Sequence, residues 1–175
     1  MFSLLAFLPS SWLLGNGCPT WPPNRQLVYR LTTEFSLPTF ILTDYDPYGI
    51  EIALTYKFGS LAMAWTPERL AVPSAIWLGL LPSDLGQLGI EEESMRPLSK
   101  EDRKKIQDLH LRDYVGNFCP QLTEELEILW RVGRKAEIQQ VSEEREPGFL
   151  AQGFLSTKLL YLERLACEGL GGEIF

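Results

Sequence analysis

The segment Phe40–Ile52, with the sequence FILTDYDPYGIEI, predicts a strand, an acidic turn and a helix in succession. Its apolar start is typical of a buried strand, and the run ends in two acids one residue apart, Asp44 and Asp46. Pro47 and Gly49 mark a turn, after which apolar residues recur at helical spacing. Because ligands bind outside the carboxyl ends of strands in open parallel sheets, we expect both acids at a functional edge.

The two acids are candidate metal ligands. Two carboxylates on a tight turn offer a hard, oxygen-only site that suits Mg²⁺ or Mn²⁺ better than zinc. Mg²⁺ usually takes one or two carboxylates, keeps several waters and completes its shell with substrate phosphate oxygens. The competing interpretation is that Asp44 or Asp46 only caps the following helix, since Asp is a preferred N-cap residue. The spacing leaves both interpretations open because Asp-x-Asp is short and common.

Length and composition fit one domain. The chain is 45% hydrophobic, which is enough to form a core. Its 175 residues are too few for two large domains. With 23 acidic and 16 basic residues the net charge is -7, which argues against strong DNA binding by this chain alone. It does not exclude a metal-dependent DNA site, where acids are needed and basic contacts come from elsewhere.

Cysteine and histidine give no sign of a zinc site. The three cysteines, Cys18, Cys119 and Cys167, are widely spaced and form no Cys-x-x-Cys, so free thiols in a reducing compartment are expected. His110 is the only histidine, and a surface or packed position at a helix end is the better interpretation.

The first residues are apolar without predicting a membrane segment. Met1–Leu8 resembles a signal-peptide core, but it lacks a basic start and Pro9 interrupts it too early for a membrane span. We expect a buried helix here, followed by a strand at Trp12–Leu14.

The remaining chain alternates strands and helices. Asn24 predicts the N-cap of a helix from about Arg25 to Phe35. Ala75–Gly79 predicts a strand, and Asp84 behind it is expected to be an ordinary helix cap. Ser99 and Asp102 form a capping-box pair that predicts a helix over residues 99–110. Further helices are expected over residues 123–132 and 149–167, and a helical turn or more over residues 135–139. The pattern predicts an α/β fold: a parallel sheet of about four strands flanked by helices, with a helical C-terminal part.

The acidic segment Thr43–Ile52, continued by Tyr56–Ser60, resembles the Asp-x-Asp-Pro-His-Gly-Ile-Glu-Ile segment of the topoisomerase VI A-subunit family. That family includes the meiotic double-strand-break protein, sporulation-protein-eleven, and the segment belongs to its Toprim domain. Further blocks similar to the family follow in order, at Gly15–Pro19, Asn24–Arg25, Leu78–Leu85, Lys135–Gln139 and Phe154–Leu159. The resemblance extends over about residues 11 to 162 and is specific because several motifs agree in order.

The resemblance implies that residues 1–175 form a single, partial Toprim domain without the family's winged-helix domain. It implies a transesterification in which a tyrosine of that other domain attacks a DNA phosphodiester, while Toprim acids hold Mg²⁺ at the scissile phosphate. Carried over by position, Asp44 and Asp46 would be the catalytic metal ligands. The partners implied are DNA, a second copy of the chain and a B-type topoisomerase VI subunit, and the location implied is the nucleus.

The chain also departs from the family pattern. Asn16 replaces the lysine of the glycine loop, Thr20 its acid, and Tyr48 stands where the family usually has His. The family's essential first-strand glutamate would precede Met1. No tyrosine has the context of a nucleophile, neither Tyr29, Tyr45, Tyr48, Tyr56, Tyr114 nor Tyr161. We therefore expect weak Mg²⁺ binding and no DNA cleavage by this chain alone.

Three functions remain open. The first is the Toprim domain of a DNA-cleaving transesterase, and the second is a non-catalytic Toprim remnant that serves dimerisation or DNA binding. The third is an Asp-x-Asp phosphatase of the haloacid-dehalogenase kind. That motif expects Thr or Val where this chain has Tyr48, so the phosphatase ranks last.

Overall fold

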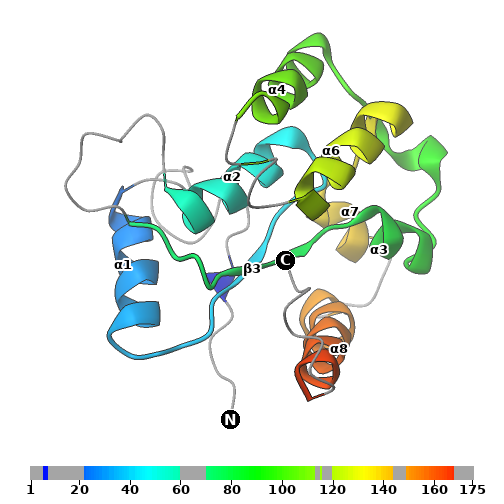
Figure 1. The fold of residues 1–175 in the computed structure, drawn as a ribbon. Coiled ribbons are helices and arrows are strands. Elements are labelled where there is room, and N and C mark those ends of the chain that lie inside the picture. The colour runs from blue at the N-terminus through cyan, green and yellow to red at the C-terminus, as the bar shows by residue number, and fades with distance from the viewer. Residues whose placement is uncertain are drawn as a thin grey trace.

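A small parallel sheet lies at the centre of the computed structural model (Figure 1). The structure describes residues 6–7, 22–59, 70–112, 115, 120–143 and 149–167. The sheet has three strands in the order β1-β2-β3, which are β1 (Ala6–Phe7), β2 (Phe40–Leu42) and β3 (Ile76–Gly79). Both neighbouring pairs are parallel, so the strand that precedes Asp44 and Asp46 is the central one.

The ladder between β2 and β3 continues past the ends of both strands. The Thr43 amide donates to the Gly79 carbonyl at 2.7 Å, and the Leu80 amide donates to the Thr43 carbonyl at 2.7 Å. The buried Trp77 indole also donates to the Thr43 hydroxyl at 3.0 Å. Because three hydrogen bonds fix Thr43, the chain enters the acidic turn from a defined position.

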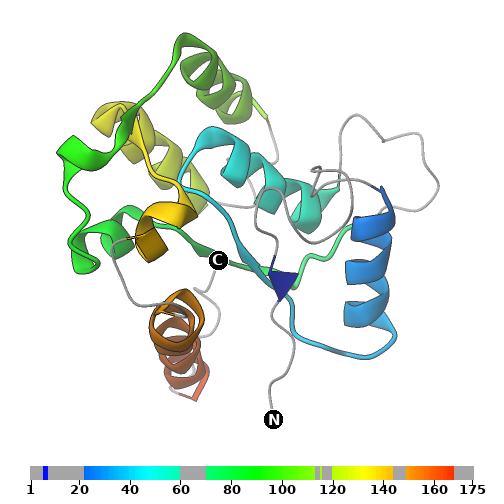
Figure 2. The same cartoon turned by 180° about the vertical axis from the view of Figure 1, so that it is seen from behind.

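Helices surround this sheet (Figures 1 and 2). In both views α4 lies at one end of the molecule and α8 at the other. The helices are α1 (Pro22–Thr33), α2 (Pro47–Phe58), α3 (Pro82–Gln87), α4 (Lys100–His110), α6 (Pro120–Val132), α7 (Ile138–Glu143) and α8 (Ser156–Cys167). A 3₁₀ turn spans Glu92–Ser94, and a π-helical segment (Leu150–Leu155) runs into α8.

A second, separate pair of strands joins distant parts of the chain. β4 (Arg96–Pro97) and β5 (Arg134–Lys135) are antiparallel, and the next residue, Ala136, forms an antiparallel bridge with Tyr45. The chain after α6 is therefore attached both to β4 and to the acidic turn.

One hydrophobic core holds these elements together. Apolar residues of β2, α2, α4, α6 and the π-helical segment share it. The most deeply buried include Ile50, Leu54, Leu80, Leu109, Leu122, Leu129 and Leu155, each at most 1% exposed. Burying such side chains stabilises a fold by about 1.5–3 kcal/mol each relative to leaving them exposed.

Several expectations from sequence need correction. Ala6–Phe7 is a strand and not the expected helix, and the strand expected at Trp12–Leu14 lies outside the described residues. A short apolar run without a clear period is compatible with either a strand or a helix, so the sequence does not decide between them. In the structure, parallel pairing with β2 makes Ala6–Phe7 a strand. Among the described residues the parallel sheet has three strands, so a four-stranded sheet is not confirmed.

Two helix boundaries and one short strand also differ. Asn24 is not an N-cap: α1 begins at Pro22, and Asn24 is buried within it. The helix expected from Thr123 begins at Pro120, since proline is well suited to a first helical turn. Lys135 lies in strand β5, and helix α7 begins only at Ile138.

Other local expectations are confirmed. Ser99 and Asp102 form the predicted capping box of α4, with Asp102 N to Ser99 Oγ at 3.0 Å and Ser99 N to Asp102 Oδ2 at 2.9 Å. Asp84 caps α3 by accepting from the Leu81 amide at 2.8 Å. His110 is exposed at the end of α4. Across the described parts of the chain, no helix combines the length and the apolar character needed to span a bilayer.

The acidic turn requires glycine at position 49 for reasons of space. A Cβ built on Gly49 would lie 2.3 Å from the Asp44 carbonyl oxygen. We predict that Gly49→Ala destabilises the protein by about 1–3 kcal/mol, the usual cost of overpacking, measured by urea unfolding. Gly86→Ala is the matched control, because nothing lies within 4 Å of a Cβ there, and its effect should be neutral or stabilising. An unchanged urea midpoint for Gly49→Ala would contradict this close approach.

Candidate functional site

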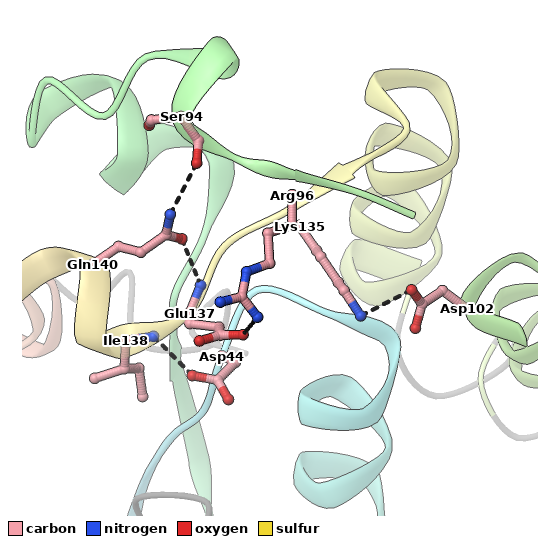
Figure 3. Close-up of polar contacts among 8 residues, drawn as sticks. All are labelled: Asp44, Ser94, Arg96, Asp102, Lys135, Glu137, Ile138 and Gln140. Carbon is pink, nitrogen blue, oxygen red and sulfur yellow. Dashed lines mark hydrogen bonds and ion pairs between the residues drawn. The ribbon is translucent and has the colours of Figure 1, made fainter. Parts of the chain in front are cut away.

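The site is built on the turn that follows β2. Asp46 is the N-cap of α2, and its Oδ1 accepts a hydrogen bond from the Gly49 amide at 2.6 Å. The Asp44 Oδ1 accepts from the Ile138 amide at 2.8 Å, at the start of α7 (Figure 3). The capping interpretation is therefore confirmed for Asp46, whereas Asp44 caps a helix 94 residues further along the chain. Each contact orients a carboxylate without neutralising it.

The backbone between the two acids is clamped by the segment Arg134–Gln140. The Tyr45 amide donates to the Ala136 carbonyl at 2.9 Å, and the Ala136 amide donates back to the Tyr45 carbonyl at 3.1 Å. Reciprocal bonds of this kind make a short two-stranded ladder. Asp44 and Asp46 thus flank a residue that is fixed on both of its backbone hydrogen-bonding groups.

The clamping segment is itself held from several sides (Figure 3). The Gln140 side chain accepts from the Glu137 amide at 2.9 Å and donates to the Ser94 carbonyl at 3.0 Å. Arg96 pairs with Glu137 at 2.5 Å, between exposed side chains. These contacts anchor the segment to the loop around Ser94–Arg96, so its position does not depend on the acidic turn alone.

A buried ion pair joins the same segment to α4. Lys135 Nζ lies 2.8 Å from Asp102 Oδ2, and the Asp102 side chain is only 2% exposed (Figure 3). Burial alone would raise the pKa of Asp102, but the bonds from Lys135 and Ser99 outweigh it and hold that pKa below its usual value. Asp102 is therefore a stably charged carboxylate behind the acidic turn.

The charge of Asp46 is less favourable. Burial is the largest cause that raises its pKa, the Gly49 amide opposes that shift, and the nearby charge of Asp44 raises the pKa further. Lys135 lowers the pKa of Asp46, and Asp102 raises it. Two carboxylates close together repel each other, so a cation bound between them would relieve this repulsion.

Asp84, the acid that follows β3, does not join the pair. Asp84 is 5% exposed, and its Oδ2 lies 2.6 Å from Lys158 Nζ, which also donates to the Leu78 carbonyl at 2.5 Å. Lysine thus already supplies the cation at the carboxyl end of β3. Within the part of the chain that the structure describes, no three His, Cys, Asp or Glu side chains are grouped to hold a metal ion. The donor set at the turn is the two carboxylates, which fits the one or two that Mg²⁺ usually takes.

Tyr45 lies between the acids, yet it is not suited to be a nucleophile. It is 1% exposed, and burial, with the nearby charge of Glu125, raises the pKa of its hydroxyl. A buried hydroxyl that resists ionisation can neither reach nor attack a phosphate.

Sequence reasoning finds neither the ion pair between Lys135 and Asp102 nor the hydrogen bond from the Ile138 amide to Asp44. In the sequence Lys135 is only one residue of a family-like motif, and Asp102 is only a helix cap. The Ile138 amide carries no signal, because a backbone group that approaches a side chain from far along the chain leaves no trace in residue type. The Ser99–Asp102 spacing is the available hint, and it predicts only the local role.

The comparisons with known proteins agree with the resemblance. The family model for the Toprim domain of the topoisomerase 6 A-subunit and Spo11 matches residues 13–159. The chain is 38% identical to the Meiotic recombination protein SPO11 of Mus musculus, over 87% of this chain and 38% of that protein. It is 37% identical to the Meiotic recombination protein W68 of Drosophila melanogaster, over 78% of this chain and 38% of that protein. It is 36% identical to the DNA topoisomerase 6 A-subunit of Arabidopsis thaliana, over 68% of this chain and 28% of that protein. The chain thus spans less than two fifths of the length of each of these relatives.

The Lys135–Asp102 pair yields a prediction about stability. Lys135→Met leaves a buried carboxylate without its cation, which should destabilise the protein by about 2–4 kcal/mol at pH 7. Because the pKa of Asp102 is lowered in the folded state, the pair stabilises the fold above the unfolded-state pKa of about 3.9. That contribution is lost as the pH falls through the lower folded-state pKa, so the deficit of the variant should shrink at pH 3.

Urea unfolding at pH 7 and pH 3 checks this prediction. Arg96→Met is the matched control, because it removes a cation from the exposed pair with Glu137, whose side chains are 66% and 37% exposed. Such a pair contributes at most about 1 kcal/mol. Equal losses for Lys135→Met at both pH values would show that the lost stability is packing rather than charge.

Proposed function

Because the chain belongs to the Toprim domain family of Spo11 and the topoisomerase 6 A-subunit, we propose that it is the metal-binding domain of a DNA-cleaving enzyme of meiotic recombination. The observation that carries the proposal is the acidic turn. Asp44 and Asp46 lie at the carboxyl end of the central strand β2, and backbone amides orient both of them. That is the edge at which parallel sheets bind ligands.

The proposed cofactor is Mg²⁺ or Mn²⁺, held by Asp44 and Asp46. Such an ion, when bound, would stabilise negative charge that develops on a phosphate. Oxygen donors and the absence of thiolate or imidazole from the pair fit this choice.

The other residues of the site have supporting roles in this proposal. Gly49 and Ile138 donate backbone hydrogen bonds that fix the two carboxylates. Lys135 lowers the pKa of Asp46 and so favours the ionised form that a metal ligand must have. Asp102 holds Lys135 beside the turn at 2.8 Å.

The proposed reaction is a transesterification of DNA. A tyrosine oxygen attacks a backbone phosphorus atom, the bond from phosphorus to the 3′ oxygen breaks, and the tyrosine becomes linked to the 5′ end. We propose that this tyrosine belongs to a winged-helix domain and meets the Toprim site of a second protomer. The proposed partners are DNA, a second copy of the chain and a B-type topoisomerase VI subunit, and the nucleus is the proposed location.

One specific observation favours a non-catalytic role as the alternative. Asp44 and Asp46 both act as helix caps, and no third acid joins them among the described residues. A domain with those features could keep the fold as a dimerisation or DNA-binding module without catalysis. The phosphatase alternative has no such support, and hydrolysis of p-nitrophenyl phosphate would be its direct test.

Metal binding discriminates between the two leading functions. We predict that calorimetry detects Mg²⁺ or Mn²⁺ binding to the unmodified chain and that Asp44→Asn with Asp46→Asn abolishes it. Asparagine is nearly isosteric and is a good N-cap, so the fold should persist while the negative charge is lost. Metal ligands of this kind require the ionised carboxylate.

The matched control is Asp108→Asn with Glu93→Gln, which removes the same charge from two exposed side chains away from the turn. The control should bind the metal as the unmodified chain does. No heat from the unmodified chain would favour the non-catalytic alternative. Equal loss in both double variants would mean that net charge, not the acidic turn, attracts the ion.

A further inference from the structure

Charge is distributed unevenly over this chain. Residues 96–112 and 131–137 carry nine of the 16 basic residues but only four of the 23 acidic ones. Their net charge is +5 in a chain whose net charge is -7, so the remaining residues carry -12. The fold brings the two segments together, because β4 pairs with β5 and α4 packs against α6 (Figures 1 and 2). One basic region therefore belongs to an otherwise acidic protein.

Five cations of this region lie on α4 and at the end of α6, and we call them the basic face: Lys100, Arg103, Lys104, Arg131 and Arg134. Three of them, Lys100, Lys104 and Arg131, are exposed. Arg103 connects the two helices, since its guanidinium carbon lies 5.2 Å from the centroid of the Trp130 ring. A Cβ built on Gly133 would also lie 3.1 Å from Arg103 Nη2. The α4 cations are thus next to the chain that carries Arg131 and Arg134.

The fold does not neutralise these five charges. None of them forms an ion pair with an acid in the part of the chain that the structure describes. Lys104 lies four residues before Asp108, a spacing that allows an ion pair on a helix, yet these two side chains form none. Arg134 donates to the Met95 carbonyl at 3.0 Å, which leaves its charge uncompensated. A solvated helix surface is usually laced with ion pairs of both signs, so the unpaired cations need another explanation.

The basic face borders the acidic turn. Asp102, in the first turn of α4, pairs with Lys135 at 2.8 Å (Figure 3). The residue after Lys135 is Ala136, which bridges Tyr45 between the two acids. The charges of Asp102 and Lys135 both act on the pKa of Asp46, so the start of α4 is close to the turn. A ligand that reaches the acidic turn therefore has these cations beside it.

We propose that the basic face binds the phosphate backbone of double-stranded DNA on the flank of the acidic turn. The inference rests on the proposed function, because the turn supplies the reason for a duplex to be there. Duplex DNA carries one negative charge per about 1.7 Å of its axis, so a duplex held at the turn presents further phosphates to the neighbouring surface. Lysine and arginine without acid partners suit such phosphates, and the contact is independent of base sequence. An acidic protein is the other polyanion that could bind there, and the experiment below distinguishes it.

Anisotropy of a labelled duplex of about 20 base pairs tests this contact, with the full chain in Mg²⁺ over a series of low salt concentrations. We expect Lys100→Gln with Lys104→Gln to weaken binding by about tenfold or more at the lowest salt, because two phosphate contacts are lost. The slope of log K against log salt should fall in magnitude by about 2. The matched control is Arg30→Gln with Arg164→Gln, which removes the same charge from exposed side chains of α1 and α8. The control should bind within about twofold of the unmodified chain, with an unchanged slope.

Each outcome decides the inference. Equal losses in the two double variants would overturn it, as would absence of duplex binding by the unmodified chain. Binding of polyglutamate as tight as that of the duplex, with the same dependence on Lys100 and Lys104, would overturn it in favour of an acidic protein. Metal calorimetry on the same proteins separates the two proposals: Mg²⁺ binding that depends on Asp44 and Asp46 keeps the proposed function even where the basic face fails. Melting temperatures within a few degrees of the unmodified chain establish that each variant is folded.

Discussion

The backbone bridge between Tyr45 and Ala136 is the contact on which the site depends. Its two hydrogen bonds attach the end of the parallel sheet to the segment that follows α6. That segment also brings the Ile138 amide to Asp44 and Lys135 to Asp102. Loss of the bridge would leave the turn held by Thr43 on one side and by the α2 cap on the other. The carboxylates would then keep their sequence spacing but lose their common support.

The site concentrates charge in a place that costs stability. The pKa of Asp46 is raised by burial and by Asp44, so its ionised form is disfavoured in the folded chain. Because that folded-state pKa lies above the unfolded-state value, the cost is present at neutral pH and disappears as the pH falls below the unfolded-state pKa. Asp102 behaves in the opposite way, since Lys135 and Ser99 lower its pKa. The two carboxylates thus have opposite effects on the stability of the fold at neutral pH.

The sequence predicts this fold well where the determining contacts are local. The Asp46 cap, the Ser99–Asp102 box and the Asp84 cap all lie within about four residues of their partners, as capping rules require. The resemblance locates the acids for the same reason, because the whole motif lies in one segment. Prediction fails for Ala6–Phe7, where an apolar run has no period that separates a strand from a helix.

The contacts that assemble the site could not be predicted in the same way. The Asp44–Ile138 bond spans 94 residues and ends on a backbone amide, which every residue type except proline carries. Lys135 gives no indication in the sequence that Asp102 is its partner, because the chain offers 23 acids to any lysine. Such pairings follow from the way β5 lies against β4, a long-range arrangement.

Capping and metal binding are compatible roles for the two acids. A carboxylate has two oxygens and about four lone-pair sites, so accepting one amide hydrogen does not exhaust its capacity as a ligand. The hydrogen bond from the amide instead removes, before binding, rotational freedom that the carboxylate would otherwise lose on binding a metal ion. In this chain Asp44 and Asp46 each accept a backbone amide, from elements far apart in sequence, and the Tyr45–Ala136 bridge fixes the residue between them. Under the proposed function the capping bonds would preorganise the two carboxylates for a metal ion, so capping does not argue against that proposal.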